Sequence, residues 1–138
     1  CRRHPLAIGL SCFSQNFRTG NEFAFSLEGF AHYYRHYSDL MQHWQETLNL
    51  PILDLRYETL VRQPRESIER LLEFCDLPWD DACLDFDKNQ RFVDTLSYAQ
   101  VRRPLTQEPA ARHLKYETEL APLSDALAEE IAAYEKDI

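Results

Sequence analysis

The sequence lacks several features that would assign it to a common class. Its only glycines are Gly9, Gly20 and Gly29, and they lie far apart, so the chain has no glycine-rich loop that cradles phosphate with backbone amides. No stretch approaches the ~18 consecutive apolar residues of a membrane-spanning helix. The opening CRRHPLAIGL also lacks the long apolar region of a signal peptide. We therefore expect neither a membrane span nor a secretion signal.

Cysteine and positive charge are also sparse. The four cysteines, Cys1, Cys12, Cys75 and Cys83, include no C-x-x-C pair, which argues against a zinc knuckle or a dithiol redox motif. Scattered thiols are typical of a reducing compartment, so we expect a cytoplasmic protein. The net charge of −8 and the pI near 5.1 argue against a general nucleic-acid binder.

Positive charge is concentrated in one segment, residues 95–115. It holds four basic side chains and one acidic side chain between two acidic stretches. Adjacent arginines (Arg102 and Arg103) in a proline-containing loop, with Ser97 nearby, are typical of a nest for a small, highly charged anion. The alternative is a solvated run of charge, which the acidic flanks disfavour but do not exclude.

The pattern of apolar residues predicts a mostly helical chain with one clear strand. We expect helices over 6–17, 27–48, 64–75 and 117–136, a short helix over 80–86, a strand over 51–57, and an irregular segment over 87–109. One strand cannot satisfy its own backbone hydrogen bonds, so it must join a parallel sheet. The other strands of that sheet would lie upstream of residue 1, and the chain begins CRRHP without methionine. For both reasons we expect it to be the later part of an α/β domain.

Two further segments are suited to binding an anion. Arg3 precedes the first predicted helix, where the carboxyl end of a strand would lie, and its guanidinium offers a bidentate fork to phosphate. Ser11 lies two turns into that helix and could reach the same anion; the alternative is a surface arginine and a core-facing serine. Tyr57, at the end of the predicted strand, could contact a ligand or act as a wedge between sheet and helix.

The order and spacing of these motifs resemble a known family. Arg3-His4-Pro5 is followed by Ser11, then by YETLV at 57–61, and then by TLSYAQVRRP at 95–104. This order resembles sulfotransferases that use 3′-phosphoadenosine 5′-phosphosulfate (PAPS). It is most similar to bacterial sulfotransferases that are often fused to tetratricopeptide repeats, and to protein-tyrosine sulfotransferases. The similarity extends over nearly the whole chain.

The resemblance implies a role for each matching residue. Arg3 and Ser11 match the pair that grips the 3′-phosphate of PAPS, and Tyr57 matches the tyrosine that lines the nucleotide pocket. Ser97 matches a catalytic serine near the sulfuryl group. Arg102 would lie in the loop that closes over the nucleotide.

The same loop departs from the family pattern near its end. Arg112 matches a basic residue that reaches phosphate in the relatives. His113 stands where relatives often have tryptophan, and Ala111 where they often have glycine. The path of the closing loop is therefore open at these positions, although the family resemblance is not affected.

The resemblance also implies the architecture and the reaction. Residues 1–138 would form the C-terminal portion of a P-loop-NTPase-like parallel-sheet domain and hold the 3′-phosphate half of the site. The 5′-phosphosulfate loop, the catalytic base and possible fused tetratricopeptide repeats would lie upstream. The enzyme would transfer the sulfuryl group of PAPS to a hydroxyl of a protein, sugar or small molecule, releasing 3′,5′-ADP, with no metal.

Three alternatives remain open. The first is a P-loop-like nucleotide kinase, whose fold is related. The second is a non-catalytic helical interaction module, with an aromatic docking face on helix 27–48 formed by Tyr33, Tyr34, Tyr37 and Trp44. The third is a metal site at His32 and His36, which lie one turn apart on that helix.

Overall fold

The computed structural model describes residues 1–15, 17, 19–88, 106 and 108–136. These residues are mostly helical, and none of them belongs to a strand longer than a single bridge. The chain divides into two compact units. The small unit contains Cys1–Arg2 and Leu53–Gln107, and the large unit contains Arg3–Ile52 and Glu108–Ile138. We describe each unit by itself.

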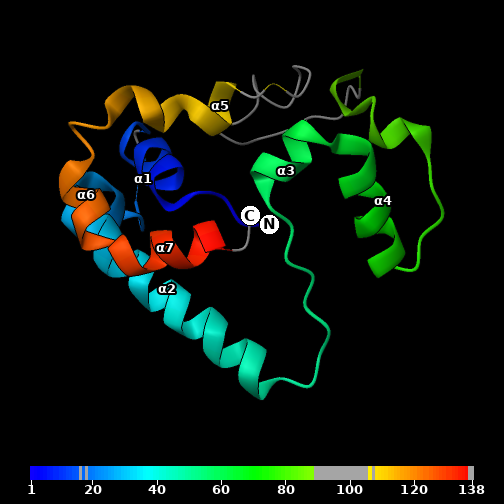
Figure 1. Cartoon of the computed structure of the whole chain (residues 1–138), viewed down its shortest axis with the longest axis horizontal. Helices are drawn as coiled ribbons and strands as arrows, with labels where there is room; N and C mark the ends of the chain where they lie inside the picture. Colours follow the sequence, from blue (N-terminus) through cyan, green and yellow to red (C-terminus); the bar gives the residue numbers. More distant parts are fainter. Residues whose placement is uncertain (16, 18, 89–105, 107, 137–138) are drawn as a thin grey trace. The chain divides into compact units, whose positions relative to one another are not determined.

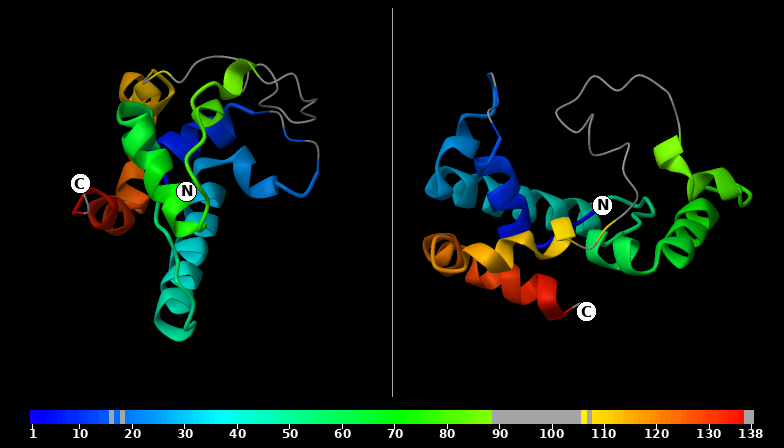
Figure 2. Two further views of the ribbon diagram at one scale, coloured as in Figure 1. Left: turned by 90° about the vertical axis from the view of Figure 1, so that its right-hand side faces the viewer. Right: turned by 90° about the horizontal axis from the view of Figure 1, so that it is seen from above.

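The large unit is built from both ends of the sequence. Its elements are α1 (Pro5–Phe13), the 3-10 helix η1 (Glu22–Phe25), α2 (Leu27–Thr47), α5 (Glu108–Ala111), the 3-10 helix η4 (Arg112–Tyr116), α6 (Ala121–Ala126) and α7 (Ala128–Lys136). Helix α1 packs against all the others. Figures 1 and 2 show it lying against α2 and the C-terminal helices. The first helix of the sequence is therefore the centre of this unit.

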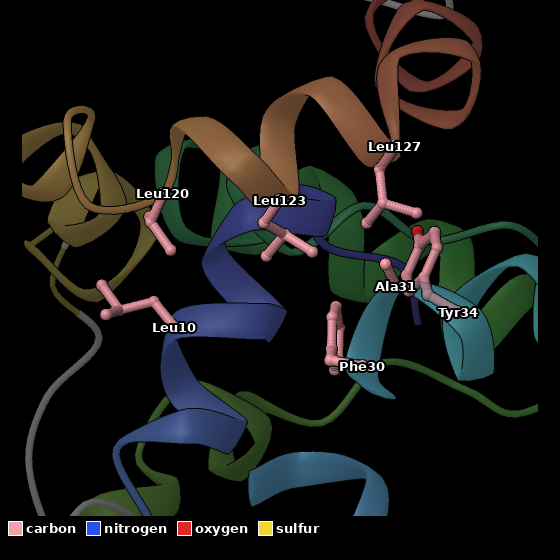
Figure 3. Packing of buried hydrophobic residues seen from close by; sticks show 7 residues of the cluster. All are labelled: Leu10, Phe30, Ala31, Tyr34, Leu120, Leu123 and Leu127. Atoms are coloured by element: carbon pink, nitrogen blue, oxygen red, sulfur yellow. The ribbon is translucent and has the colours of Figure 1, made fainter. Parts of the chain in front are cut away.

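Apolar side chains from α1, α2 and the C-terminal helices form the core of the large unit. Figure 3 shows them pointing toward one another: Leu10, Phe30, Ala31, Tyr34, Leu120, Leu123 and Leu127. Leu127 is completely buried and Leu123 exposes 1% of its surface. Burying a leucine side chain contributes about 1.5–3 kcal/mol, so this cluster is the main source of stability in the unit.

Gly9 allows α1 to approach its neighbours closely. A Cβ atom built at this position would lie 2.5 Å from Cδ2 of Leu123 and 3.1 Å from Cε1 of Phe30. Both of those side chains are buried in the core and have little room to move in a close-packed interior. Glycine at this position therefore sets how near α1 lies to α2 and α6.

Helix α2 confirms the predicted helix over 27–48 almost to the residue. The Ser26 hydroxyl accepts a hydrogen bond from the Gly29 amide at 2.9 Å, as expected of an N-cap. The apolar stripe is buried only in its first half, because Tyr34 lies in the core whereas Tyr37 and Trp44 are 39% and 43% exposed. The hydrophobic period predicted the helix correctly, but it did not reveal how far along α2 the core extends.

The predicted terminal helix over 117–136 is wrong as one continuous helix. Two helices, α6 and α7, are separated at Leu127, where φ is −111° and ψ is 25°. Pro122 lies in the first turn of α6, where the missing N–H costs nothing. In a helix that began at Glu117, the same proline would occupy an interior position and break a hydrogen bond.

The small unit contains α3 (Tyr57–Arg62), α4 (Pro64–Phe74) and the 3-10 helices η2 (Asp81–Cys83) and η3 (Phe86–Lys88). Helix α4 begins at Pro64 as predicted and packs against α3. The Arg65 guanidinium lies over the ring of Trp79 at 4.4 Å and 3.3 Å from the Asp81 carboxylate. These contacts tie the start of α4 to the turn that follows it.

The predicted strand over 51–57 is wrong as a strand, although its parallel direction is confirmed. Within the small unit, Arg2 and Arg56 form a single parallel bridge. The Arg2 amide donates to the Leu55 carbonyl, and the Tyr57 amide donates to the Arg2 carbonyl, each at 2.7 Å. A strand needs a row of such partners, and the described residues supply a single bridging residue, Arg2. The predicted α/β class is therefore confirmed here only in its mostly helical part.

None of the helices in the described ranges is both long and apolar enough to cross a lipid bilayer.

We expect Leu127→Ala to lower the free energy of unfolding by about 2–5 kcal/mol, the usual cost of removing a buried leucine side chain. Leu50→Ala is the matched control, because Leu50 is 67% exposed and its loss should change stability by less than about 0.5 kcal/mol. Urea unfolding followed by circular dichroism measures both variants. Equal effects would contradict the assignment of the core.

Candidate functional site

Arg2 and Arg56 pair in a single parallel bridge, and a helix follows each of them in the sequence. Arg2 is followed in the sequence by α1, and Arg56 is followed at once by α3. The Arg2 side chain donates to the Asp54 carboxylate at 2.6 Å, so its charge is already paired. Two parallel segments that both run into helices have the arrangement found at the ligand-binding edge of α/β sheets.

Arg3 and Ser11 both belong to the large unit, at opposite ends of α1. The Nε atom of Arg3 is buried, and Ser11 is half-buried. Burial raises the pKa of the Cys12 thiol, and the positive charge of Arg3 acts in the opposite direction. The charge of Arg3 therefore acts on α1 at Cys12, the residue next to Ser11. A guanidinium and a serine hydroxyl are both groups that donate hydrogen bonds to anions.

His4, the residue after Arg3, contacts several other parts of the large unit. Its Nδ1 accepts a hydrogen bond from the Leu6 amide at 3.3 Å and so caps α1. Its ring stacks on that of His113, with centroids 4.5 Å apart and planes 14° from parallel. The edge of Tyr134 meets the same ring at 5.7 Å, and Nε2 lies 3.7 Å from the Glu135 carboxylate. We did not predict these contacts.

Arg112 is the first residue of η4 and directly precedes His113. Its side chain is exposed, whereas His113 is buried. The large unit therefore contains three of the predicted nucleotide-binding residues: Arg3, Ser11 and Arg112. Two of them, both arginines, stand immediately before the two stacked histidines.

Three predicted site residues remain: Tyr57, Ser97 and Arg102. Tyr57 belongs to the small unit, where it begins α3, is half-buried and donates its amide proton to the Arg2 carbonyl. Ser97 and Arg102 lie outside the described residues. Their predicted roles at the sulfuryl group and in the closing loop stay predictions.

The two histidines proposed for a metal site lie side by side on α2. The Nε2 atoms of His32 and His36 are 3.1 Å apart, and both side chains are exposed. Within the described ranges, no group of three or more histidine, cysteine or acidic side chains is arranged to hold a metal ion. The pair by itself therefore offers two ligands.

A groove of about 570 Å³ borders the same helix, between its first turns and α6. The guanidinium of Arg35 lies on the wall of this groove, and the other polar lining residues are Ser26, Glu28 and His32. The Arg35 guanidinium donates to the carbonyl of Ala126 and lies 3.9 Å from the Glu130 carboxylate. Because its charge is already used within the large unit, we assign no ligand to this groove.

Comparison with known proteins decides the family. The family model described as "Sulfotransferase family" matches residues 1–81, which include Arg3, Ser11 and Tyr57. The chain belongs to the sulfotransferase family. Among curated proteins, it is similar to an uncharacterized protein of Aquifex aeolicus (strain VF5), with 34% identity over 131 residues. That alignment covers 93% of this chain and 17% of the Aquifex protein. No solved structure matches it.

A test of the local electrostatics follows from Cys12. The thiolate is the form that reacts with alkylating reagents, so the raised pKa should move the pH profile of Cys12 alkylation above that of an exposed cysteine. Arg3→Gln removes the charge that opposes this shift and should move the profile to still higher pH. The measurement uses protein in which Cys1, Cys75 and Cys83 are replaced by serine, so that Cys12 alone reacts.

The matched control is Arg65→Gln, which removes one positive charge from the small unit and should leave the Cys12 profile in place. A profile that moves to lower pH in Arg3→Gln, or stays where it is, would show that the Arg3 guanidinium is not near Cys12.

Proposed function

We propose that the protein is a PAPS-dependent sulfotransferase that transfers a sulfuryl group to a hydroxyl acceptor, and that its large unit binds the 3′-phosphate of the nucleotide. Membership of the sulfotransferase family supports the reaction class. The observation that carries the assignment of the phosphate site is the position of Arg3. Its Nε atom is buried two residues before the start of α1, the helix that carries Ser11, and its positive charge opposes the rise in the pKa of the Cys12 thiol.

The chemistry of this position fits a phosphate. A guanidinium makes charge-assisted, bidentate hydrogen bonds to phosphate oxygens, and a serine hydroxyl donates one more. The N-terminus of α1, at Pro5, follows Arg3 closely in the chain, and the positive end of a helix favours a nearby anion. The Nε atom of Arg3 is buried, so an ion pair formed there would be screened less than one at the surface.

The remaining roles follow from the resemblance to the family. Tyr57 would line the nucleotide pocket, and Arg102 and Arg112 would approach the phosphates from the closing loop. PAPS supplies the sulfuryl group, and negative charge develops on the bridging oxygen of the departing 3′,5′-ADP. By analogy with phosphoryl transfer, the part of this chain is mainly to position the nucleotide. Ser97 would donate a hydrogen bond toward the developing charge.

The acceptor is a hydroxyl group, and a protein, a sugar or a small molecule would each supply one. The chain spans 17% of the length of the Aquifex protein that it matches, so the choice of acceptor is a property of the whole protein. Among the alternatives, membership of the sulfotransferase family favours sulfuryl transfer over a nucleotide kinase. A non-catalytic helical module would not bind the nucleotide at all.

We expect Arg3→Ala to weaken binding of adenosine 3′-monophosphate at least tenfold. A hydrogen bond to a charged group contributes about 1.5–3 kcal/mol, and about 1.4 kcal/mol corresponds to a factor of ten. Binding of adenosine 5′-monophosphate, which lacks the 3′-phosphate, should change much less. Isothermal titration calorimetry with both nucleotides separates loss of the phosphate contact from general damage.

Arg65→Ala is the control variant, since Arg65 is held by Trp79 and Asp81 in the small unit and has no proposed ligand. Its affinity for both nucleotides should equal that of the unaltered protein. An Arg3→Ala variant that binds adenosine 3′-monophosphate with unchanged affinity would refute the 3′-phosphate site. A protein that binds neither nucleotide would favour the non-catalytic alternative.

A further inference from the structure

We propose that the stacked rings of His4 and His113, which we call the histidine clamp, position the arginines that precede them around one anion. The inference rests on the proposed function, because it concerns how the same phosphate site is held in shape. In this role the two histidines are positioning residues: they stack on each other and need not touch the nucleotide. Tyr134 of α7 holds the clamp closed.

The first step is the geometry of the clamp. The two rings are nearly parallel at 4.5 Å, and the elements that carry them, α1 and η4, pack against each other. His113 exposes 9% of its surface, and the His4 side chain exposes 14%. A side chain in a stacked, buried ring pair has few rotamers left. The backbone positions of Arg3 and Arg112, one residue before each ring, are restrained with it.

The second step is the orientation of the His4 ring. Because Nδ1 accepts a hydrogen bond from the Leu6 amide, that nitrogen carries no proton, and the proton of the neutral ring is on Nε2. The capping bond fixes the plane of the ring relative to the first turn of α1. The position of Arg3 is therefore tied both to the start of α1 and to η4.

The third step is the lock supplied by α7. Tyr134 exposes 2% of its surface, and its edge meets the His4 ring at 82° to the ring plane. The adjacent Glu135 faces Nε2 of the same histidine. The family model ends at residue 81, so His113 and both α7 residues lie in the part of the chain that it does not match. The clamp therefore brings that later part to the phosphate site.

The fourth step is the benefit for binding. Two guanidinium groups repel each other, and a site that must gather them when the ligand arrives binds less tightly than one in which they are already placed. The stacked rings hold the two segments together before the ligand arrives. The clamp is thus a preorganising device for the proposed anion site.

The first test needs no ligand, because Cys12 senses the charge of Arg3. In protein whose only cysteine is Cys12, His113→Ala should move the pH profile of alkylation toward higher pH, in the direction of Arg3→Gln. His113→Phe keeps an aromatic ring in the stack and should leave the profile near that of the unaltered protein. Circular dichroism and thermal melting confirm that each variant is folded at the temperature of the assay.

The second test measures affinity for 3′,5′-ADP by calorimetry. His113→Ala should weaken binding by about tenfold through loss of preorganisation, and His113→Phe should restore most of it. Arg112→Ala should weaken binding in the unaltered protein but have little further effect in His113→Ala, since residues that act together are not additive. A purely structural role for His113 would instead give additive effects.

A second variant applies if His113→Ala does not fold. His4→Asn retains an N-capping side chain at the start of α1 but removes the ring from the stack. The clamp predicts the same shift of the Cys12 profile and the same loss of affinity. Unchanged values in a folded His4→Asn protein would overturn it, and so would a His113→Phe protein that behaves like His113→Ala.

The outcomes also separate the clamp from the proposed function. If the unaltered protein does not bind 3′,5′-ADP but the Cys12 profile shifts in His113→Ala, the clamp stands and the sulfotransferase proposal fails. If the protein binds 3′,5′-ADP and loses affinity in Arg3→Ala, while the histidine variants change neither readout, the phosphate site stands and the clamp is wrong.

Discussion

The ring of His4 accepts a hydrogen bond from the Leu6 amide and stacks on His113. Together these contacts fix where α1 begins and what it faces. The rest of the large unit depends on this placement, since α1 packs against every other element there. Gly9 lets α1 approach Phe30 and Leu123 closely, so the same helix that presents Arg3 and Ser11 also lies against the core. The candidate site is therefore supported by the most buried part of the unit.

Ion pairs occur within each unit. In the small unit, Arg2 pairs with Asp54, and Arg65 pairs with Glu69 and Asp81. In the large unit, Arg35 pairs with Glu130, and the positive charge of Arg3 opposes the rise in the pKa of the Cys12 thiol. The Nε atom of Arg3 is buried, so its charge is screened less by salt than a charge at the surface.

Local signals predicted the elements well wherever one or two residues decide the outcome. Pro5 and Pro64 lie at the starts of α1 and α4, and Ser26 caps α2. Where the outcome depends on distant partners, the predictions failed. The predicted strand over 51–57 forms one bridge, at Arg56. Among the described residues its bridge partner is Arg2, and a strand would need a row of such partners. The terminal helix failed for a local reason instead, since Pro122 lies in the first turn of α6 and that helix ends at Leu127.

The sequence by itself was enough to recognise the family, because motif order and spacing are properties of the chain alone; the roles of Arg3, Ser11 and Tyr57 stay predictions. It was also enough to place α2, whose apolar period is strong. Only the tertiary structure decided that α2 is buried in one half, and that Arg3 and Arg112 each precede a ring of one stacked pair. The physical reason is that a stack between residues 4 and 113 depends on how α1 packs against η4, and no local pattern encodes a contact across that separation.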